Sequence, residues 1–457
     1  MDSLWTSEEI AAATNGSASA PFEVTGVAFD SREIGQGDLF IAMKGELTNG
    51  HRFLDQVQAA GAAGAIVSEG GALPHVLVDD TTKALNDLGR ASRARSKAKI
   101  IGVTGSVGKT STKEALFAAL DRPKRGQAHR SVKSYNNHTG VPLSLARMPR
   151  EARFGVFEMG MSAAGELAAL TRLVRPHVAI VTAIAPAHRE FFASEEEIAD
   201  AKGEIFQGLE PGGTAIVPFD SPYRDQLIRA AEPYAAKIVT FGLGQGADVR
   251  ALDVVPVARG TLISATLPDA ELTFTIGHPG EHWVSNALAV IAAVQAVGGD
   301  LAAAGLALAE LEGMKGRGAR HRIALPGGEA LVIDESYNAN PASMAATLKT
   351  LGAEGSATRR IAILGSMREL GPGSNDFHAA LAEPIEAARV DHAILVGEEM
   401  GALAKALGNR VDFTHVPDAA SATARAREMI GPGDAILVKG SNSVGLSALV
   451  AALVGEG

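Results

Sequence analysis

The stretch KIIGVTGSVGKTSTKEAL, residues 99–116, joins an apolar run to a glycine-rich bend and then to a helix-forming sequence. A strand followed by TGSVGKTS and a helix is typical of a loop that holds phosphate groups. Glycines let the backbone approach a phosphate, and the N-terminus of the helix adds positive potential. In such a loop Lys109 would contact the outer phosphates of a nucleotide, and the Thr110 hydroxyl would bind Mg²⁺.

The loop is a variant of the strict phosphate-loop pattern. That pattern has a glycine five residues before Gly108, where this chain has Val103, and the nearby glycines are Gly102 and Gly105. The alternative interpretation is an ordinary glycine-rich turn between a strand and a helix. The sequence Gly-Lys-Thr-Ser favours the phosphate loop.

The composition predicts several α/β domains. The chain has 457 residues, and at roughly 100–200 residues per domain this suggests about three. Glycine and alanine are abundant and only 5% of the residues are aromatic, which fits alternating strands and helices. The net charge of −10 does not suggest a nucleic-acid-binding surface. The absence of cysteine excludes disulfides, thiolate metal sites and cysteine nucleophiles.

The sequence favours a soluble cytoplasmic protein. Its first residues, MDSLWTSEEI, lack the basic start and apolar core of a signal peptide. No uncharged apolar run is long enough to span a bilayer.

Changes in pattern divide the chain into three stretches with predicted bounds 1–97, 98–313 and 314–457. The first has three short β-like runs, DLFIAM, GAIVS and VLVDD, and one helical pattern, HRFLDQVQAAGAAG. The basic polar segment GRASRARSKAK closes it and predicts a boundary. The second starts with the phosphate loop and continues with the strand-like runs FGVFEM, HVAIVTAI and GTAIVPF, separated by helical patterns. This alternation predicts a parallel sheet with helices on both faces.

The second stretch has a further part, and a linker separates it from the third. Residues 247–276 form short alternating runs, which predict an antiparallel meander, and the helix VSNALAVIAAVQAV closes the stretch. Residues 313–321, GMKGRGARH, are glycine-rich and basic and predict a linker. The third stretch repeats the strand–helix alternation with the runs ALVIDE, RIAILG, HAILVG and DAILVKG.

Two polar residues of the second stretch are candidates for a metal site, and a third, a lysine, has an unusual position. Glu158 and His188 follow predicted strands, at the edge where open α/β sheets bind ligands. Each could instead be an ordinary strand-end charge or loop histidine. Lys202 falls on the apolar stripe of a predicted helix, between Ile198 and Ile205, where a lysine either extends outward or has a partner or modification.

Polar residues also follow three predicted strands of the third stretch. The alternative is a set of ordinary strand-to-helix turns, which is less convincing for three turns together. The residues are Asp334, Tyr337, Asn338 and Asn340 after the first strand, Glu369 after the second, and Lys439.

Together these segments resemble the Mur ligase family of peptidoglycan synthesis, and within it the MurF type. The resemblance covers almost the full chain in order and rests on TGSVGKTS, NNHTGVP, EMG, AHRE, AKGEIF, GEHWVSNALA, YNANP and KGS, with DSREIGQGDLFIAMKGELTNGHRF near the N-terminus. It implies three domains: a UDP-substrate domain, a central P-loop ATPase domain and a Rossmann-like C-terminal domain for the incoming dipeptide and part of ATP. It also implies ATP, Mg²⁺, UDP-N-acetylmuramoyl-tripeptide and D-Ala-D-Ala as ligands, and we expect a monomer.

The resemblance also implies roles for individual residues. It implies that Lys109, Glu158, His188 and Lys202 are catalytic, and that Thr110, Glu158, His188 and Lys202, as a carbamate, form the metal site. The implied ATP-binding residues are Gly105, Ser106, Gly108, Lys109, Thr110, Ser111, Asn286, Arg317, Asp334 and Tyr337. The implied substrate-binding residues are Asp30, Ser31, Arg32, Asn137, Asn338 and Asn340.

The sequence departs from the family pattern at three positions, and other functions remain open. Trp283 follows His282 where the family often has His-Asn, Ser366 replaces an aspartate, and Asn442 replaces an arginine. The alternatives are a folylpolyglutamate synthase-like ligase, a P-loop small-molecule kinase and a nucleotide-binding regulatory module. The N-terminal segment argues against the first, and the set of Glu158, His188 and Lys202 argues against the last.

Overall fold

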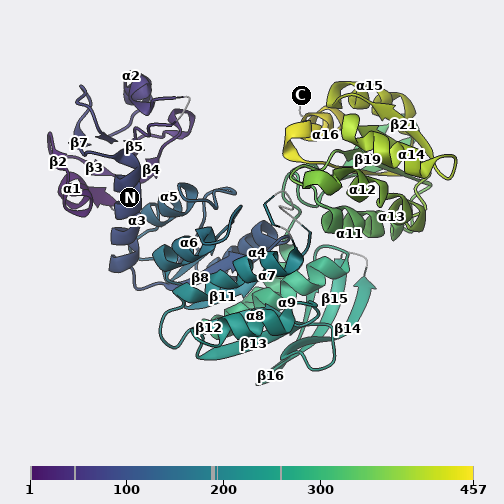
Figure 1. Ribbon diagram of the computed structural model, residues 1–457, viewed down its shortest axis with the longest axis horizontal. Helices are drawn as coiled ribbons and strands as arrows, with labels where there is room; N and C mark the ends of the chain where they lie inside the picture. Colours follow the sequence, from purple (N-terminus) through teal and green to yellow (C-terminus); the bar gives the residue numbers. More distant parts are fainter. Residues whose placement is uncertain (1–2, 46–47, 187–190, 193, 258–259, 456–457) are drawn as a thin grey trace.

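The chain folds into three α/β units, each built around its own sheet. The computed structural model describes residues 3–45, 48–186, 191–192, 194–257 and 260–455, and the statements below concern those residues. The three sheets have five, nine and six strands in chain order. Figure 1 shows the N-terminal and C-terminal units as two arms standing on the central unit. The predicted α/β fold is confirmed.

The N-terminal unit has a mostly parallel five-stranded sheet in the order β2-β7-β6-β5-β4. Only β2 runs antiparallel to its neighbour, and a separate pair, β1 and β3, is also antiparallel. The strands are β1 (Trp5–Thr6), β2 (Ser17–Ala18), β3 (Glu23–Val24), β4 (Gly26–Ala28), β5 (Asp38–Ile41), β6 (Gly64–Val67) and β7 (His75–Leu77). The helices are α1 (Ser7–Thr14), α2 (Leu54–Ala59) and α3 (Thr81–Arg95), with 3₁₀ turns η1 (Ser31–Glu33) and η2 (Gly50–Phe53).

The helix α3 fastens this unit to the central one. The basic segment 89–99, which the sequence suggested as a boundary, is helical as far as Arg95. The buried Arg93 guanidinium donates hydrogen bonds to the Val174 carbonyl, 2.7 Å away, and to Glu210, 3.2 Å away. The segment therefore lies where the first two units meet, as a helix end whose arginine contacts the central unit rather than as an open linker.

The central unit has a nine-stranded sheet in the order β16-β15-β14-β13-β12-β11-β8-β10-β9. Strands β8 to β14 pair in parallel, and β14, β15 and β16 form the predicted antiparallel meander. The strands are β8 (Lys99–Thr104), β9 (Ala128–Arg130), β10 (Phe154–Glu158), β11 (Val178–Val181), β12 (Thr214–Pro218), β13 (Lys237–Gly242), β14 (Val249–Val257), β15 (Gly260–Leu267) and β16 (Ala270–Ile276).

Helices cover both faces of this sheet, as predicted. Alternate residues of β8 point to opposite faces, so Ile101 and Val103 join one core cluster and Ile100 joins the other. On the first face lie α4 (Lys109–Asp121), α9 (Glu281–Ala296) and α10 (Leu301–Glu310). On the second lie α5 (Gly140–Ala146), α6 (Glu166–Val174), α7 (Glu195–Gly203) and α8 (Arg224–Ala231), with the 3₁₀ turn η3 (Glu204–Gly208). The sequence analysis missed β13 and α10.

The C-terminal unit has a six-stranded sheet in the order β17-β18-β22-β19-β20-β21, in which only β17 is antiparallel to its neighbour. The strands are β17 (Ala319–Leu325), β18 (Gly328–Glu335), β19 (Arg359–Gly365), β20 (His392–Val396), β21 (Asp412–Val416) and β22 (Asp434–Lys439). The helices are α11 (Pro341–Gly352), α12 (Ser374–Ala379), α13 (Ala382–Ala387), α14 (Gly401–Leu407), α15 (Ala419–Met429) and α16 (Leu446–Val454), with 3₁₀ turns η4 (Gly371–Gly373), η5 (Glu398–Met400) and η6 (Asn442–Val444).

The connection to the C-terminal unit is a short loop. The predicted linker 313–321 is too long, because β17 begins at Ala319 and pairs there with Asp334. An exposed ion pair, Lys349 with Glu281 at 2.9 Å, also joins the two units. Exposed pairs of this kind contribute little to stability. Among the described residues no helix is both long and apolar enough to cross a membrane.

Candidate active site

A cleft of about 1210 Å³ lies between the central and C-terminal units. Its walls come from the loop before α4, the ends of β10 and β11, the start of α9, and the loops after β18, β19 and β22. Most of the predicted site residues line it, although they come from segments far apart in the chain. These are Ser106, Gly108, Lys109, Thr110, Ser111, Asn137, Glu158, Asn286, Arg317, Tyr337, Asn338 and Asn340.

The phosphate-type loop occupies the predicted position between β8 and α4. Lys109 is the first residue of α4, and its Nζ donates a hydrogen bond to the Gly105 carbonyl at 2.5 Å. The Lys109 side chain therefore folds back over the loop. Burial lowers the pKa of Lys109. The negative charge of Glu158 raises that pKa, and the positive charge of Arg317 lowers it.

Two glycines of the loop are required by geometry. Gly108 has φ +83°, and a Cβ there would lie 2.6 Å from Asn286 Oδ1. Gly105 has φ +147°, and its Cβ would lie 2.0 Å from the hydroxyl of Thr182 on the neighbouring strand end. A side chain at either position would strain the backbone and displace a neighbour. The loop thus fits closely against β11 and α9.

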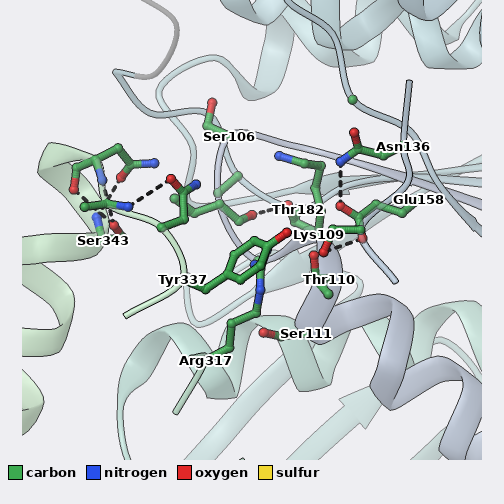
Figure 2. Close-up of a pocket in the computed structure, with 18 of the residues that line it drawn as sticks. Ser106, Lys109, Thr110, Ser111, Asn136, Glu158, Thr182, Arg317, Tyr337 and Ser343 are labelled. Atoms are coloured by element: carbon green, nitrogen blue, oxygen red, sulfur yellow. Dashed lines mark hydrogen bonds between the residues drawn. The ribbon is translucent and has the colours of Figure 1, made fainter. Parts of the chain in front are cut away.

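Both carboxylate oxygens of Glu158, in the cleft, accept hydrogen bonds. It ends β10, is only 1% exposed and lies beside the loop. One oxygen accepts the Thr110 hydroxyl at 2.9 Å, and the other accepts the Asn136 side-chain amide at 2.8 Å. Figure 2 shows Asn136 and Thr110 reaching Glu158 from opposite sides. The carboxylate is therefore fixed next to the hydroxyl that the loop pattern assigns to a metal.

Lys202 is fully buried on α7, as its place on the apolar stripe suggested. Its Nζ has no hydrogen-bond partner among the residues that the structure describes. Burial lowers the pKa of Lys202 well below its usual range, and the positive charge of Lys109 lowers it further. An unpartnered ammonium is costly at such a position, so burial favours the neutral amine. Lys202 does not line the cleft itself.

Several predicted site residues lie elsewhere. His188 is outside the described residues. Asp30, Ser31 and Arg32 lie in the N-terminal unit, where Asp30 begins the turn η1. The Asp30 carboxylate accepts hydrogen bonds from the Arg32 guanidinium, which hold the pKa of Asp30 at about 2.

Asp334 also does not line the cleft. It is buried at the end of β18, where its carboxylate accepts the Gly316 N–H at 2.7 Å and the Ser336 hydroxyl at 2.6 Å. Asp334 therefore fixes the loop that connects the units. The neighbouring Arg317 lies over the Tyr337 ring, 4.3 Å from its centroid, and Figure 2 shows the two side chains together in the cleft.

The three predicted substrate asparagines all have local contacts. Asn340 caps α11 by accepting the Ser343 N–H at 2.9 Å. Asn137 accepts the Gly140 N–H at 2.9 Å at the start of α5. The Asn338 side chain accepts the N–H of the next residue, and its carbonyl accepts Lys439 Nζ at 3.0 Å. These asparagines line the cleft, and their hydrogen bonds also fix the conformation of its wall.

The structure shows the location of the three residues that depart from the family pattern. Trp283 stacks on His278, with ring centroids 4.2 Å apart, and lines the cleft. Ser366 is buried and donates a hydrogen bond to Glu399 at 2.8 Å. Asn442 begins η6 and lines the cleft.

Sequence reasoning missed two buried groups near the cleft. Lys113, on α4, lies 3.8 Å from Glu158 Oε2 with a fully buried side chain. Its spacing of four residues from Lys109 was an available signal, because residues four apart share a helix face. Glu335 lies 3.6 Å from the predicted Lys439 and also lines the cleft. Burial raises the pKa of Glu335 and lowers that of Lys439.

The fold and this cleft define an ATP-dependent ligase that forms amide bonds, and family models agree. A model described as "Mur ligase family, catalytic domain" matches residues 23–101, "Mur ligase middle domain" matches 103–294, and "Mur ligase, glutamate ligase domain" matches 321–442. The chain belongs to the Mur ligase family.

Similar proteins extend over the full length. A UDP-N-acetylmuramoyl-tripeptide–D-alanyl-D-alanine ligase of Bacillus subtilis is 35% identical over 94% of this chain and 93% of its own. A crystal structure of MurF from Acinetobacter baumannii has a TM-score of 0.85 at 30% identity and covers 99% of both chains. A MurF ligase from Thermotoga maritima in complex with ADP has a TM-score of 0.78 at 25% identity, covering 95% of this chain and 98% of its own.

Proposed function

We propose that this chain adds D-alanyl-D-alanine to UDP-N-acetylmuramoyl-tripeptide at the expense of ATP, forming the pentapeptide precursor of peptidoglycan. The observation that carries the proposal is the similarity to ligases of this name over nearly the whole chain, including the N-terminal unit. The cleft supports it, because a phosphate-type loop faces polar loops of a second unit.

The reaction needs an activated carboxylate, because a carboxylate is a poor electrophile. An oxygen of the terminal tripeptide carboxylate attacks the γ-phosphorus of ATP, and ADP leaves with the electron pair of the broken P–O bond. The amine of D-Ala-D-Ala then attacks the acyl carbon of the acyl phosphate. The tetrahedral intermediate loses phosphate, and the nitrogen loses a proton, which leaves the amide.

The central unit, residues 98–313, would bind most of ATP. Lys109 would stabilise the negative charge that develops on the outer phosphates, with Gly105, Ser106, Gly108 and Ser111 surrounding them. Asn286 lies against Gly108 and would contact adenine.

Mg²⁺ fits the donors beside the loop. The Thr110 hydroxyl and the Glu158 carboxylate lie 2.9 Å apart, and oxygen ligands suit this hard cation. Thr110, Glu158, His188 and Lys202, as a carbamate, would hold the ion. When bound, Mg²⁺ neutralises negative charge on the phosphates.

The two arms would bring the substrates to this centre. The N-terminal unit, residues 1–97, would bind the UDP-substrate through Asp30, Ser31 and Arg32. The C-terminal unit, residues 314–457, would bind the dipeptide and part of ATP. In this proposal Arg317, Asp334 and Tyr337 act on the nucleotide side, and Asn137, Asn338 and Asn340 act on the substrate side. The enzyme would work in the cytoplasm as a monomer.

A product assay tests the proposed function. With ATP, UDP-N-acetylmuramoyl-tripeptide and D-Ala-D-Ala all present, we expect ADP, phosphate and the pentapeptide in equal amounts, measured by mass spectrometry and phosphate release. Omitting D-Ala-D-Ala should stop turnover. Continued ADP formation with accumulation of a stable phosphorylated product would instead identify a small-molecule kinase.

We also expect the C-terminal unit to close on the central one when substrates bind. The proposed ATP contacts come from both sides of an open cleft, and a short glycine-rich loop joins the units, so closure would complete the site. Small-angle X-ray scattering should give a smaller radius of gyration with an ATP analogue and the UDP-substrate than without them. Identical scattering profiles would contradict closure as an assembly step.

A further inference from the structure

Lys113 is a fully buried lysine to which the proposed mechanism gives no role. It lies one helical turn after Lys109 on α4, and its side chain is 0% exposed. Lysine is almost never fully buried without partners, because a desolvated ammonium is costly. Lys113 is not among the residues that line the cleft, so it is placed behind the site.

The ammonium of Lys113 has a complete set of partners. It donates to the Lys133 carbonyl at 2.5 Å, lies 3.5 Å from the Ser131 carbonyl, and pairs with Glu114 at 3.0 Å. These contacts match its three N–H donors. Glu158 Oε2 lies just beyond them, at 3.8 Å. Lys113 therefore holds backbone of another segment and places positive charge next to the buried Glu158 carboxylate.

The segment held by Lys113 is residues 131–137, which we call the strap. The strap runs past the end of β10 and is bonded to it around Glu158. The Glu158 N–H donates to the Ser131 hydroxyl at 2.9 Å, and the Gly160 N–H donates to the Asn136 carbonyl at 2.8 Å. The Asn136 side chain then donates to Glu158 itself.

One residue of the strap has an unfavourable backbone conformation, which contacts from other segments stabilise. Lys133 has φ +48°, in the left-handed region that residues with a Cβ rarely adopt. Its carbonyl is the one that Lys113 binds at 2.5 Å, and its side chain pairs with Glu33 of the N-terminal unit. The contact from α4 thus holds the strap at its least favourable residue.

We propose that Lys113 is a positioning residue that holds the strap, and through Asn136 fixes the Glu158 carboxylate beside Thr110. The role of Glu158 in this proposal rests on the proposed function. Loss of the Lys113 ammonium frees the Ser131 and Lys133 carbonyls, shifts the strap, and leaves Glu158 without a fixed orientation.

The test is a double-mutant cycle of Lys113→Met with Asn136→Ala. Each single variant should lower kcat about 10²-fold, because a displacement of about 1 Å near reacting groups has that effect. The double variant should lose little more than either single variant, because both act on Glu158 through the strap. Lys124→Met, at an exposed lysine after the same helix, is the matched control and should keep wild-type activity.

A second readout does not depend on turnover. ADP affinity is measured by calorimetry with and without Mg²⁺, and the Mg²⁺-dependent gain should fall about 10-fold in both single variants. ADP affinity without Mg²⁺ should remain unchanged, since Lys109 and its loop are intact. A purely structural lysine would lower only the melting temperature and leave this gain unchanged in the folded protein.

Two results would overturn the proposal: losses in kcat that multiply in the double variant, or an unchanged Mg²⁺-dependent gain. If Lys113→Met does not fold, Lys113→Gln is used in the same cycle, because its amide can still bond one strap carbonyl. Ligation by the wild-type protein tests the proposed function separately, so the two failures are distinguishable.

Discussion

Lys109→Ala is expected to lower ATP turnover by about 10³-fold or more while the protein stays folded. Lys109 is the loop cation nearest the proposed phosphate position, and loss of one such contact removes several kcal/mol of transition-state stabilisation. Its Nζ bonds the nearby Gly105 carbonyl, within its own loop, so we expect its removal to leave the core intact. The measurement is kcat/KM for ATP, with melting temperature and circular dichroism to confirm the fold.

Lys99→Ala is the matched control, because Lys99 is exposed at the start of the strand that leads into the loop. It should turn over ATP at the wild-type rate. Near-normal activity of a folded Lys109→Ala variant would rule out the phosphate-loop assignment.

The Lys202→Ala variant is expected to have about 10²-fold lower ligase activity than the wild-type protein. Loss of a residue that supports a metal site has an effect of this size. A neutral buried amine can attack the carbon of CO₂, form an N–C bond and release a proton, which leaves an anionic carbamate. This converts an unpartnered nitrogen into an oxygen donor for Mg²⁺. Lys202→Glu should retain little activity unless its shorter carboxylate reaches the ion.

Chemical rescue separates this role from a packing role. Acetate or formate should partly restore the Lys202→Ala variant and should have no effect on Lys237→Ala, at an exposed lysine of β13. Carbon-13 NMR of the wild-type protein with labelled CO₂ should show a carbamate signal that is missing from Lys202→Ala. Full activity of Lys202→Ala would refute the carbamate hypothesis.

Local sequence pattern was sufficient for the parts of the site that lie within one element. The run ending at Val103 and the Gly-Lys-Thr-Ser that follows it placed the loop between β8 and α4. The apolar stripe of α7 singled out Lys202 but left open whether its side chain extends outward, and in the structure the side chain is buried. In each case the signal was a spacing of a few residues. The regular geometry of a helix or a strand fixes where residues at such a spacing lie relative to one another.

Pattern was insufficient where position depends on distant segments. The spacing of Lys113 from Lys109 places it on the same helix face, but its burial depends on the strap that folds over α4, and spacing does not reveal that contact. Asp334 follows a strand, and the sequence around it does not show that its carboxylate bonds the backbone of the loop that connects two units. A carboxylate has the same sequence signature whether it faces a ligand or the chain itself.

The two arms are fastened to the central unit in different ways, and this difference bears on how such a protein can be recombined. The N-terminal arm is joined through the buried Arg93 of α3 and through Trp5, whose indole N–H donates a hydrogen bond to the Ala146 carbonyl of the central unit at 2.9 Å. The C-terminal arm is joined by a short loop and the exposed pair of Lys349 and Glu281. A chimera exchanged near residue 313 would break an exposed ion pair, whereas one exchanged within α3 would leave the buried Arg93 guanidinium without its partners in the central unit. Exchange of gene segments should therefore be better tolerated for the C-terminal arm than for the N-terminal arm.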